Sequence, residues 1–524
     1  MRVESFLERR AVDSADKTAL ISGERRLTYR ELDDLATVLA HRLRALGLRR
    51  GDRVAVFMEN CPEAVVTIYA VLKADGVFVM INPTTKTQKL SALLFDCRPV
   101  AIVADSRRLP TAVESVAGVA SVRGIVVAGA DVTVESPSSV PMAMVTTFAT
   151  ASPDAGPQAD WKRGIDLDLA ALIYTSGSTG KAKGVMLTHR NMISAATSIT
   201  TYLGNRADDI ILNVLPLSFD YGLYQVLMAV QFGGTVVLER SFVYMHAVLE
   251  TLRRERVTGF PIVPTIAALL LELDLSEYDL SSLRYITSTG AVLPTAHINQ
   301  LRRCLPHAKV FSMYGLTECK RVSYLDPADL DRRPGSIGRG MPNEEVYLID
   351  SDGARLPNGV GELVVRGSNV MQGYWERPDE TAQVLMPGPL PGEHVLRTGD
   401  TFRMDDEGYL YFVGRRDDII KTRGEKVSPR EVEDVLHQLE GVAEAAVVGL
   451  PDPILGQAIK AVVVVRASAG VTEQDVFRHC SRHLEDFMVP HAIEIRTALP
   501  KTPNGKRDYR ALLADAPLVA PRTT

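Results

Sequence analysis

The sequence predicts an α/β fold: a large N-terminal domain of helix-flanked sheets plus a β-rich subdomain, followed by a small mobile α+β C-terminal domain. Strand-like and helix-like segments alternate through the first two-thirds of the chain, which is typical of mostly parallel sheets covered by helices. Glycines and short apolar runs then predict a compact β-rich subdomain at about 334–413. A charged break at 414–418 separates this subdomain from a last segment with its own helices and strands.

Short apolar runs predict the strands of the first two-thirds, and longer amphipathic runs predict the helices between them. The predicted strands are 54–58, 77–81, 169–174, 210–215, 235–239, 283–288 and 309–312. The predicted helices are 63–74, 189–202, 221–232, 244–255 and 295–304. The Ser/Pro/Ala-rich stretch 128–160 has little pattern and predicts a mobile surface connection.

The remaining elements follow from the same patterns. Apolar runs at 346–349, 362–365 and 409–413 predict strands of the β-rich subdomain. Beyond the break, the predicted elements are helix 429–439, strands 445–448 and 459–465, and helix 473–484. The resulting division gives 1–413 as the large domain, 414–418 as a hinge and 419–524 as the small domain. An active site is expected in the cleft between the two domains.

Composition favours a large cytoplasmic enzyme. The chain has 524 residues, which is too long for one hydrophobic core. A net charge of −5 without a basic stripe gives no support for nucleic-acid binding. No apolar run approaches the length of a membrane span, and the first ten residues lack the apolar core of a signal peptide. The five cysteines are scattered without a Cys-x-x-Cys pair, which argues against a disulfide framework or structural zinc.

The most informative motif is Thr175-Ser-Gly-Ser-Thr-Gly-Lys-Ala-Lys-Gly184, which lies between the apolar run 169–174 and Thr188, a candidate N-cap. Glycines let backbone N–H groups turn toward an anion, Ser and Thr add donors, and Lys adds positive charge. The Walker pattern is absent, because no Gly-Lys is followed by Ser or Thr. A flexible linker is the alternative, but linkers are rare between a buried strand and a capped helix. The motif therefore predicts a polyphosphate-binding loop.

Four weaker motifs follow this loop along the chain. They are Tyr314-Gly-Leu-Thr-Glu318, Thr398-Gly-Asp400, Gly414-Arg415 and Pro500-Lys-Thr-Pro-Asn-Gly-Lys506. Each alone is typical of a cap or a turn, but their order and spacing after the phosphate loop are specific. The whole set closely resembles the adenylate-forming superfamily of acyl-CoA synthetases, nonribosomal peptide synthetase adenylation domains and luciferases. The resemblance covers nearly the whole chain except 128–160.

The resemblance implies a two-step reaction that uses ATP and Mg²⁺. A carboxylate attacks the α-phosphorus of ATP and forms an acyl-adenylate and pyrophosphate. A thiol then displaces AMP and forms a thioester. Two domain arrangements, one for each step, are implied as well.

The resemblance also implies which residues hold the nucleotide. They are Thr175, Ser176, Gly177, Ser178, Thr179, Gly180, Lys183, Gly184, Gly290, Ala291, Tyr314, Gly315, Thr317, Asp400 and Arg415. Tyr314 would stack on adenine, and the small residues Gly290 and Ala291 would leave room for the ring. Asp400 would accept hydrogen bonds from both ribose hydroxyls, with Arg415 supporting the ribose from the hinge side.

The implied catalytic residues are Thr175, Glu318 and Lys506. Glu318 would hold Mg²⁺, a hard cation that prefers oxygen ligands. Lys506 would bridge the reacting carboxylate and the adenylate, because displacement at phosphorus needs neutralised charge and held geometry. Asp417 would be the hinge residue. In the second step the pantetheine arm of the thiol would pass through a tunnel lined by Lys421, Arg423 and Gly424.

Two departures from the common acyl-CoA synthetase pattern bear on the substrate. Ser218-Phe219-Asp220 replaces the usual aromatic pair and resembles peptide synthetase adenylation domains, whose aspartate here binds the substrate's amino group. An unpaired carboxylate between aromatic residues is costly, which favours a substrate ammonium as its partner. The alternative is that Asp220 caps the helix 221–232. The predicted substrate-binding residues are Phe219, Asp220, Tyr221, Thr289 and Arg321.

The second departure is Cys319-Lys320-Arg321 directly after Glu318, where small or hydroxyl residues are usual. Arg321 falls at a position that lines the acyl pocket in the peptide synthetase relatives. It could recognise a carboxylate or polar group at the far end of the substrate, although a plain hydrophobic side chain is equally compatible. The ordinary alternative is that both cations are solvated or paired with a neighbouring acid.

Together these features predict a free-standing enzyme that activates an α- or β-amino acid and loads it onto a carrier protein in trans. The chain ends soon after Lys506, so no carrier domain is expected to follow. It looks similar to enzymes that select β-amino acids for macrolactam polyketides in antibiotic biosynthesis. The alternative is an acyl-CoA synthetase for an amine-free fatty or aromatic acid, with CoA as the acceptor. Retention of Glu318, Asp400 and Lys506 argues against a nucleotide-binding regulator without chemistry.

Overall fold

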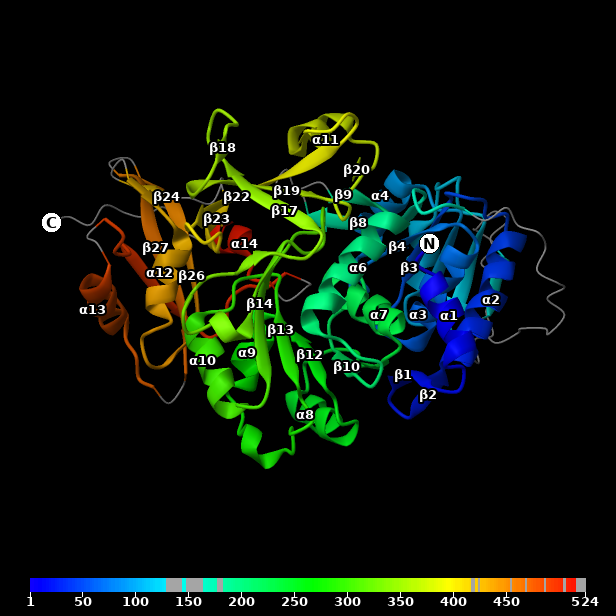
Figure 1. Cartoon of the computed structure of the whole chain (residues 1–524), viewed down its shortest axis with the longest axis horizontal. Helices are drawn as coiled ribbons and strands as arrows, with labels where there is room; N and C mark the ends of the chain where they lie inside the picture. Colours follow the sequence, from blue (N-terminus) through cyan, green and yellow to red (C-terminus); the bar gives the residue numbers. More distant parts are fainter. Residues whose placement is uncertain are drawn as a thin grey trace.

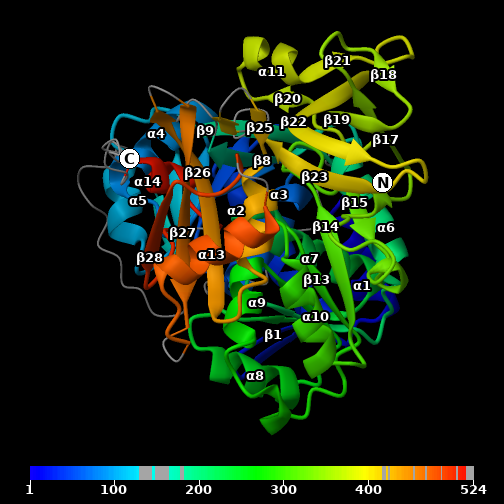
Figure 2. The same cartoon turned by 90° about the vertical axis from the view of Figure 1, so that its left-hand side faces the viewer.

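The computed structural model of the chain describes residues 1–128, 144–147, 164–176, 182–415, 420–422, 425–452, 455–466, 469–484, 487–502 and 506–514. Sheets and helices of a large N-terminal domain fill most of the molecule, and a smaller C-terminal domain lies at one end (Figure 1). Turned by 90°, the small domain faces the viewer in front of the large one (Figure 2). The predicted α/β fold class is confirmed.

An eight-stranded sheet forms the first layer of the large domain. Its order is β20 (Gly373–Tyr374), β9 (Ala182–Thr188), β8 (Leu169–Ser176), β4 (Val77–Met80), β3 (Arg53–Phe57), β5 (Ala101–Asp105), β6 (Gly124–Ala128) and β7 (Met144–Thr147). Strands β8, β4, β3, β5, β6 and β7 run parallel, and β9 and β20 add an antiparallel edge. The associated helices are α3 (Pro62–Lys73), α4 (Thr87–Cys97) and α5 (Leu109–Ser115).

A nine-stranded sheet forms the second layer. Its order is β16 (Arg339–Gly340), β15 (Ser323–Leu325), β14 (Lys309–Tyr314), β13 (Tyr285–Ser288), β12 (Gly259–Ile262), β10 (Ile210–Asn213), β11 (Thr235–Leu238), β1 (Thr18–Ser22) and β2 (Arg25–Thr28). The helices of this part are α1 (Ser5–Asp13), α2 (Tyr29–Ala45), α6 (His189–Leu203), α7 (Asp220–Phe232), α8 (Met245–Arg254), α9 (Pro264–Leu270) and α10 (Thr295–Cys304). The central strands, from β14 through to β1 in this order, run parallel.

A six-stranded antiparallel sheet follows. It comprises β17 (Glu344–Ile349), β18 (Arg355–Leu356), β19 (Gly359–Gly367), β21 (Leu385–Pro387), β22 (His394–Met404) and β23 (Leu410–Arg415), with α11 (Pro378–Val384) beside it. Two short strands within the predicted β-rich range belong elsewhere, because β16 joins the nine-stranded sheet and β20 the eight-stranded one. The β-rich subdomain is therefore bound to both sheets of the large domain.

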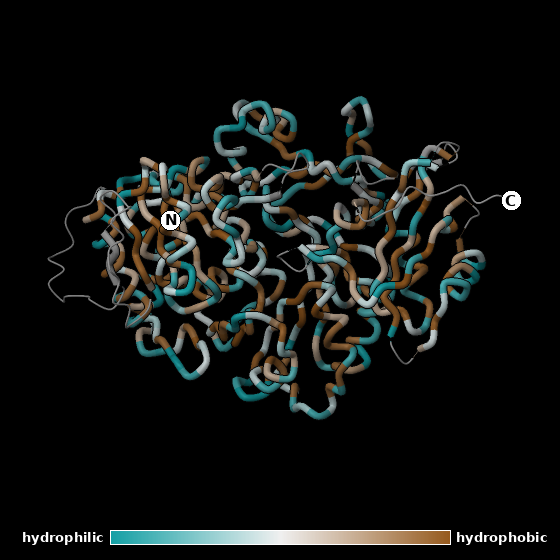
Figure 3. Tube along the Cα trace, turned by 180° about the vertical axis from the view of Figure 1, so that it is seen from behind, coloured by the Kyte–Doolittle hydropathy of each residue, from teal (hydrophilic) through white to brown (hydrophobic). Residues whose placement is uncertain are grey.

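The small domain is built on a five-stranded sheet. Its strands are β24 (Ile420–Thr422), β25 (Glu425–Val427), β26 (Val442–Asp452), β27 (Gly456–Val465) and β28 (Ala492–Arg496). Its helices are α12 (Pro429–Leu436), α13 (Glu473–His483) and α14 (Tyr509–Ala514). Apolar residues on both faces of this sheet form hydrophobic cores separate from that of the large domain. In Figure 3 the apolar segments run through the interior of both domains.

The predicted strands and helices all occur, most with ends within two residues of the prediction. Helix α12 ends three residues early, at Leu436, and β26 is longer than predicted at both ends. The prediction of a patternless connection at 128–160 is wrong for Met144–Thr147, which pairs with β6; the rest of that stretch, except Ala128, lies outside the described residues. None of the helices in the described part combines the length and apolar character that crossing a bilayer requires.

Candidate active site

Lys506 meets the large domain beside Gly290 and Phe219. Its Nζ lies 5.0 Å from the centroid of the Phe219 ring. A Cβ added to Gly290 would approach Lys506 Cε and the Phe219 ring to 3.3 Å each, and Gly290 has a φ of +88°. The left-handed backbone therefore favours glycine here, and a Cβ would also require Lys506 and Phe219 to shift slightly. The structure brings together Lys506, Gly290 and Phe219, which are far apart in the chain.

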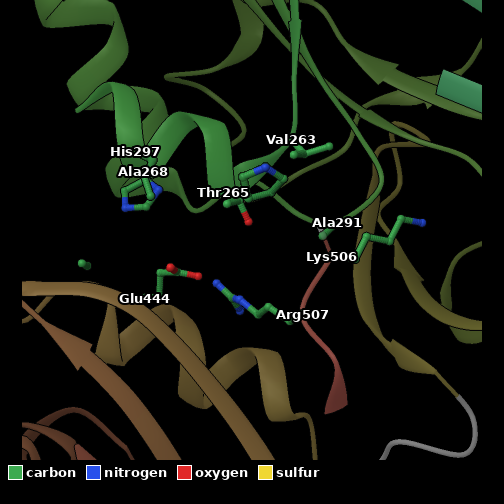
Figure 4. Close-up of a pocket in the computed structure, with 10 residues that line it drawn as sticks. Val263, Thr265, Ala268, Ala291, His297, Glu444, Lys506 and Arg507 are labelled. Carbon is green, nitrogen blue, oxygen red and sulfur yellow. The ribbon is translucent and has the colours of Figure 1, made fainter. Parts of the chain in front are cut away.

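A pocket between the two domains lies next to this contact (Figure 4). It is lined by Val263, Pro264, Thr265, Ala268, Ala291 and His297 of the large domain, and by Ala443, Glu444, Lys506 and Arg507 of the small one. Ala291, predicted beside adenine, thus lies near Lys506. The small domain presents Lys506 to the carboxyl ends of the parallel strands, where open α/β sheets bind their ligands.

Tyr314 and Asp400 form one polar unit. The Tyr314 hydroxyl donates to Asp400 Oδ2 at 2.5 Å, and the Asp400 N–H donates to Thr398 Oγ1 at 3.2 Å. Burial and the Asp400 carboxylate hold the pKa of Tyr314 well above its usual range, so the phenol stays a neutral donor. Arg415 lies opposite Asp400 in the β22–β23 register. One Asp400 oxygen is thus engaged by the predicted adenine-stacking residue.

Gly315 allows the turn that follows Tyr314. A Cβ there would lie 2.3 Å from the Lys320 carbonyl oxygen, so no other residue fits without moving the backbone. Lys320 itself has a φ of +72°, which is uncommon for a residue with a side chain. The turn folds the segment 315–321, including Thr317, back on itself behind β14. Such local strain is retained where it positions neighbouring side chains.

Tyr374 connects Glu318 with the phosphate-loop hairpin. Its hydroxyl donates to Glu318 Oε1 at 2.8 Å, and Lys183 Nζ lies 5.0 Å from its ring centroid. The remaining carboxylate oxygen suits Mg²⁺, which commonly takes one protein carboxylate plus substrate phosphates. In the described ranges no three His, Cys, Asp or Glu side chains cluster as a metal site. Tyr374 is not among the residues predicted from the sequence, although Gly373-Tyr-Trp375 is a visible aromatic motif.

The phosphate loop joins two antiparallel strands. Thr175 pairs with Lys183, Ser176 with Ala182 and Tyr174 with Gly184. The expectation of a loop between a strand and a helix is therefore wrong: β9 intervenes, and Thr188 then caps α6 through a capping box with Asn191. The loop residues Gly177, Ser178, Thr179 and Gly180 lie outside the described residues.

The other predicted mobile-domain residues are only partly described. Asp417, Arg423 and Gly424 lie outside the described residues. Lys421 pairs with Lys426 in the β24–β25 hairpin. Their roles as hinge and tunnel residues stay predictions.

Asp220 is buried and has an ion-pair partner within the chain. Lys320 Nζ lies 3.5 Å from Asp220 Oδ2, and only 3 % of Lys320 and 7 % of Asp220 are exposed. The expectation of an unpaired carboxylate is therefore wrong. The N-cap alternative is wrong too, because α7 begins at Asp220, and Phe219 occupies the cap without a side-chain hydrogen bond. Burial lowers the pKa of Lys320 to about 7, an effect that Asp220 partly offsets.

Arg321 is 2 % exposed and has no carboxylate at salt-bridge distance in the part of the chain that the structure describes. Its guanidinium carbon lies 5.0 Å from the centroid of the Tyr221 ring, and its buried Nε has no hydrogen-bond partner among the residues described. The interpretation of Arg321 as a solvated or acid-paired cation is therefore wrong, whereas for Lys320 the pairing is confirmed. A buried guanidinium without an acid is costly in the absence of a ligand.

The surrounding polar atoms divide into satisfied and unsatisfied groups. Tyr221 donates its hydroxyl to the Thr287 carbonyl at 2.8 Å, so this predicted substrate residue contributes its ring rather than its hydroxyl. By contrast, Ser218 Oγ, Ser288 Oγ and Thr289 Oγ1 are buried without hydrogen-bond partners in the portion of the chain that the structure describes. Unsatisfied buried hydroxyls beside Phe219 and Gly290 fit a polar ligand, since native proteins leave few such groups unpaired.

Comparison with known proteins agrees with this geometry. A family model described as "AMP-binding enzyme" matches residues 7–375, and one described as "AMP-binding enzyme C-terminal domain" matches 431–506. A long-chain-fatty-acid–CoA ligase of Bacillus subtilis is 32 % identical, over 98 % of this chain and 94 % of that protein. A linear gramicidin synthase of Brevibacillus parabrevis is 29 % identical, over 97 % of this chain and 10 % of that protein. The structure of ATP-bound MatB from Rhodopseudomonas palustris superposes with a TM-score of 0.86 at 27 % identity, covering 98 % of this chain and 99 % of MatB.

Proposed function

This chain belongs to the AMP-binding enzyme family and is an AMP-forming ligase that uses ATP to convert an acid into its acyl-adenylate, and we propose the identity of that acid. We propose that it is an amino acid with a second carboxylate. We also propose that the acyl group then passes to the phosphopantetheine thiol of a carrier protein in trans. The observation that carries the substrate proposal is the buried cluster of Asp220, Lys320 and Arg321.

The charges of this cluster favour a substrate with both signs of charge. With Lys320 protonated, the cluster holds two buried cations and one buried carboxylate, so it has one positive charge in excess. A substrate ammonium alone would increase the excess, whereas an ammonium and a second carboxylate together would leave it unchanged and give Arg321 a partner. The 3.5 Å between Lys320 and Asp220 exceeds the roughly 2.7–2.9 Å of a charge-assisted hydrogen bond, so Asp220 can still accept from an ammonium.

The remaining residues take the roles implied by the family. Lys506 would neutralise the reacting carboxylate and the adenylate as the carboxylate attacks the α-phosphorus. Glu318, oriented by Tyr374, would hold the Mg²⁺ that neutralises phosphate charge. Asp400 would accept from the ribose while Tyr314 holds its other oxygen. Glu318 and Asp400 are each held by a tyrosine hydroxyl before the substrate arrives, which favours electrostatic stabilisation without reorganisation.

The transfer step requires a second domain arrangement. We propose that residues 414–418 form the hinge, with Asp417 as its pivot, between the large domain 1–413 and the small domain 419–524. The same rotation that withdraws Lys506 would bring Lys421, Arg423 and Gly424 to the tunnel for the pantetheine arm. Separate hydrophobic cores in the two domains support a rigid-body movement of this kind.

A pyrophosphate-exchange panel tests the substrate proposal. It compares aspartate, glutamate and their β-amino isomers with the matching deamino diacids, with monocarboxylic amino acids, and with fatty and aromatic acids. Amino diacids are expected to give the highest kcat/KM. A fatty or aromatic acid that exceeds every amino acid would refute the proposal, and the panel gives this answer without knowledge of the thiol acceptor.

A specific observation supports one second candidate, an amine-free acid activated for transfer to CoA. Lys320 already neutralises Asp220, so an amine is not required to balance that carboxylate. The Bacillus subtilis relative, named as a fatty-acid–CoA ligase, is consistent with this candidate. In the panel the deamino acids would then exceed their amino counterparts, and CoA would replace the carrier protein as the better acceptor.

A further inference from the structure

Two imidazoles meet where the small domain contacts the large one. His297 lies on α10 of the large domain, and His437 is the C-cap of α12 in the small domain. Their ring centroids are 5.4 Å apart with an interplanar angle of 65°, and both residues are buried. His297 also lines the interdomain pocket that contains Lys506 (Figure 4). The contact therefore belongs to the arrangement in which Lys506 is presented to the large domain.

Arg507 joins this pair of rings to Lys506. Its Nη2 lies 3.3 Å from His437 Nε2, and its Nη1 donates to Glu433 Oε2 at 3.0 Å. Arginine can only donate, so His437 Nε2 accepts and its ring proton resides on Nδ1. In Figure 4 the side chains of Lys506 and Arg507 extend in opposite directions from adjacent positions. Anchoring Arg507 on α12 therefore sets the direction in which Lys506 points.

The charged groups around the rings disfavour an imidazolium. The nearby cations are Arg507 and Arg466, and both act on His297. Glu433 accepts from Arg507, from the Tyr509 hydroxyl at 3.0 Å and from the Val447 N–H at 2.9 Å. Three other acids near the rings are paired, Glu444 with Lys501, Asp434 with Arg430 and Glu272 with Arg466, and Glu431 of α12 is exposed.

Among the described residues, neither ring has an acceptor ready for an additional proton. Nδ1 of His297 and Nδ1 of His437 are both buried without a hydrogen-bond partner there. Burial, with the Arg507 charge, lowers the pKa of His297 to about 4 and holds that of His437 well below its usual range. Both imidazoles are accordingly neutral in the docked arrangement.

We propose that His297 and His437 are positioning residues that act on Lys506 through Arg507, and that the docked arrangement forms only when both rings are neutral. The inference rests on the proposed role of Lys506 in adenylate formation. When the small domain moves away, both rings gain water and His297 loses Arg507 as a neighbour, whereas His437 keeps Arg507 because both lie on the small domain. Acid therefore shifts the chain away from the arrangement used for the first step.

The direction and size of the effect follow from linkage. The pKa of His297 is lower in the docked arrangement than its free value of about 6.5, because burial disfavours the imidazolium. Its contribution to the stability of the docked arrangement is therefore fully present above about pH 6.5 and is lost as pH falls toward 4. With these two values, protonation of His297 weakens docking about tenfold at pH 5.5, and His437, whose pKa is also lowered by burial, acts in the same direction. The thiol-transfer step does not use this contact, so its rate is not expected to fall with the weaker docking at low pH.

The test compares the two half-reactions of the full chain between pH 5.5 and 8. Adenylate formation is followed by single-turnover pyrophosphate release, and thioester formation is followed from presynthesised acyl-adenylate in the same buffers. In the native chain the ratio of the first rate to the second is expected to fall at least tenfold from pH 7.5 to 5.5. In the His297→Gln/His437→Gln double variant, where glutamine still accepts from Arg507 but cannot titrate, the ratio is expected to stay within about twofold. His394→Gln, an exposed histidine in β22, is the matched control.

A second measurement does not depend on activity, so it applies even if the double variant is poorly active for other reasons. Donor and acceptor dyes at Val12→Cys and Phe477→Cys, both exposed, report the interdomain distance in a Cys304→Ser background. Acid is expected to change the distance in the native chain and not in the double variant. Equal pH dependence in native and double-variant chains by both methods would overturn the inference. Adenylate formation that survives Lys506→Ala would instead overturn the proposed role of Lys506.

Discussion

Replacement of Arg321 by glutamine separates substrate recognition from structural support. The guanidinium is nearly fully buried, faces the Tyr221 ring and has no carboxylate partner among the described residues. If a substrate carboxylate is its partner, removing one member of that buried pair costs ~3–5 kcal/mol. This corresponds to a loss of roughly two to three and a half orders of magnitude in kcat/KM for the amino diacid.

The stability of the substrate-free enzyme should not fall with the loss of kcat/KM. Arg321→Gln removes a buried charge that nothing in the described part of the chain neutralises, so the midpoint of thermal unfolding without substrate should stay the same or rise. The KM for ATP should change less than about twofold, because Tyr314, Asp400 and Glu318 are untouched. The kcat/KM for monocarboxylic amino acids should fall little.

The assay is pyrophosphate exchange on matched diacid and monoacid pairs, together with thermal unfolding. Arg302→Gln, which removes a half-exposed salt bridge to Asp331, is the control for loss of an arginine. A variant that unfolds at a lower temperature and loses activity equally toward every acid would refute the reasoning. Arg321 would then be a structural cation that supports the packing of Tyr221.

Three further predictions concern the same site. Asp220→Asn should lower kcat/KM steeply for the amino acid and little for its deamino analogue, with ATP affinity unchanged; equal losses for both acids in pyrophosphate exchange would argue for a structural Asp220–Lys320 pair. Lys506→Ala should reduce adenylate formation by ~10²–10³-fold and spare thioester formation from presynthesised acyl-adenylate, and a parallel loss in both assays would contradict domain alternation. Gly290→Ala should impair adenylate formation, because its Cβ would crowd Lys506 and Phe219 at 3.3 Å and its φ is +88°. Gly23→Ala, at an open turn with a φ of +59°, controls for backbone strain alone. Equal effects of the two changes on adenylate formation would remove the steric argument.

Local pattern was sufficient for much of the fold. The alternation of apolar runs located the strands and helices, because side-chain periodicity is a property of neighbouring residues. Thr188 was recognisable as an N-cap for the same reason, since a capping box spans four residues. The motifs from Thr175 to Lys506 likewise predicted an adenylate-forming enzyme before any contact was known. The resemblance drew on their order along the chain rather than on their distances in space.

Pairings across long stretches of chain were decided only by the tertiary structure. The sequence did not reveal that Lys320 neutralises the distant Asp220, or that Arg321 beside it has no carboxylate partner in the described part. Both cations precede a buried strand, and adjacent charges in sequence are ordinarily solvated. Their burial follows from the strained turn at Gly315 and Lys320, which folds them under Tyr221 and Tyr224. Substrate preference depends on such charge balances, and these exist only once distant segments have packed together.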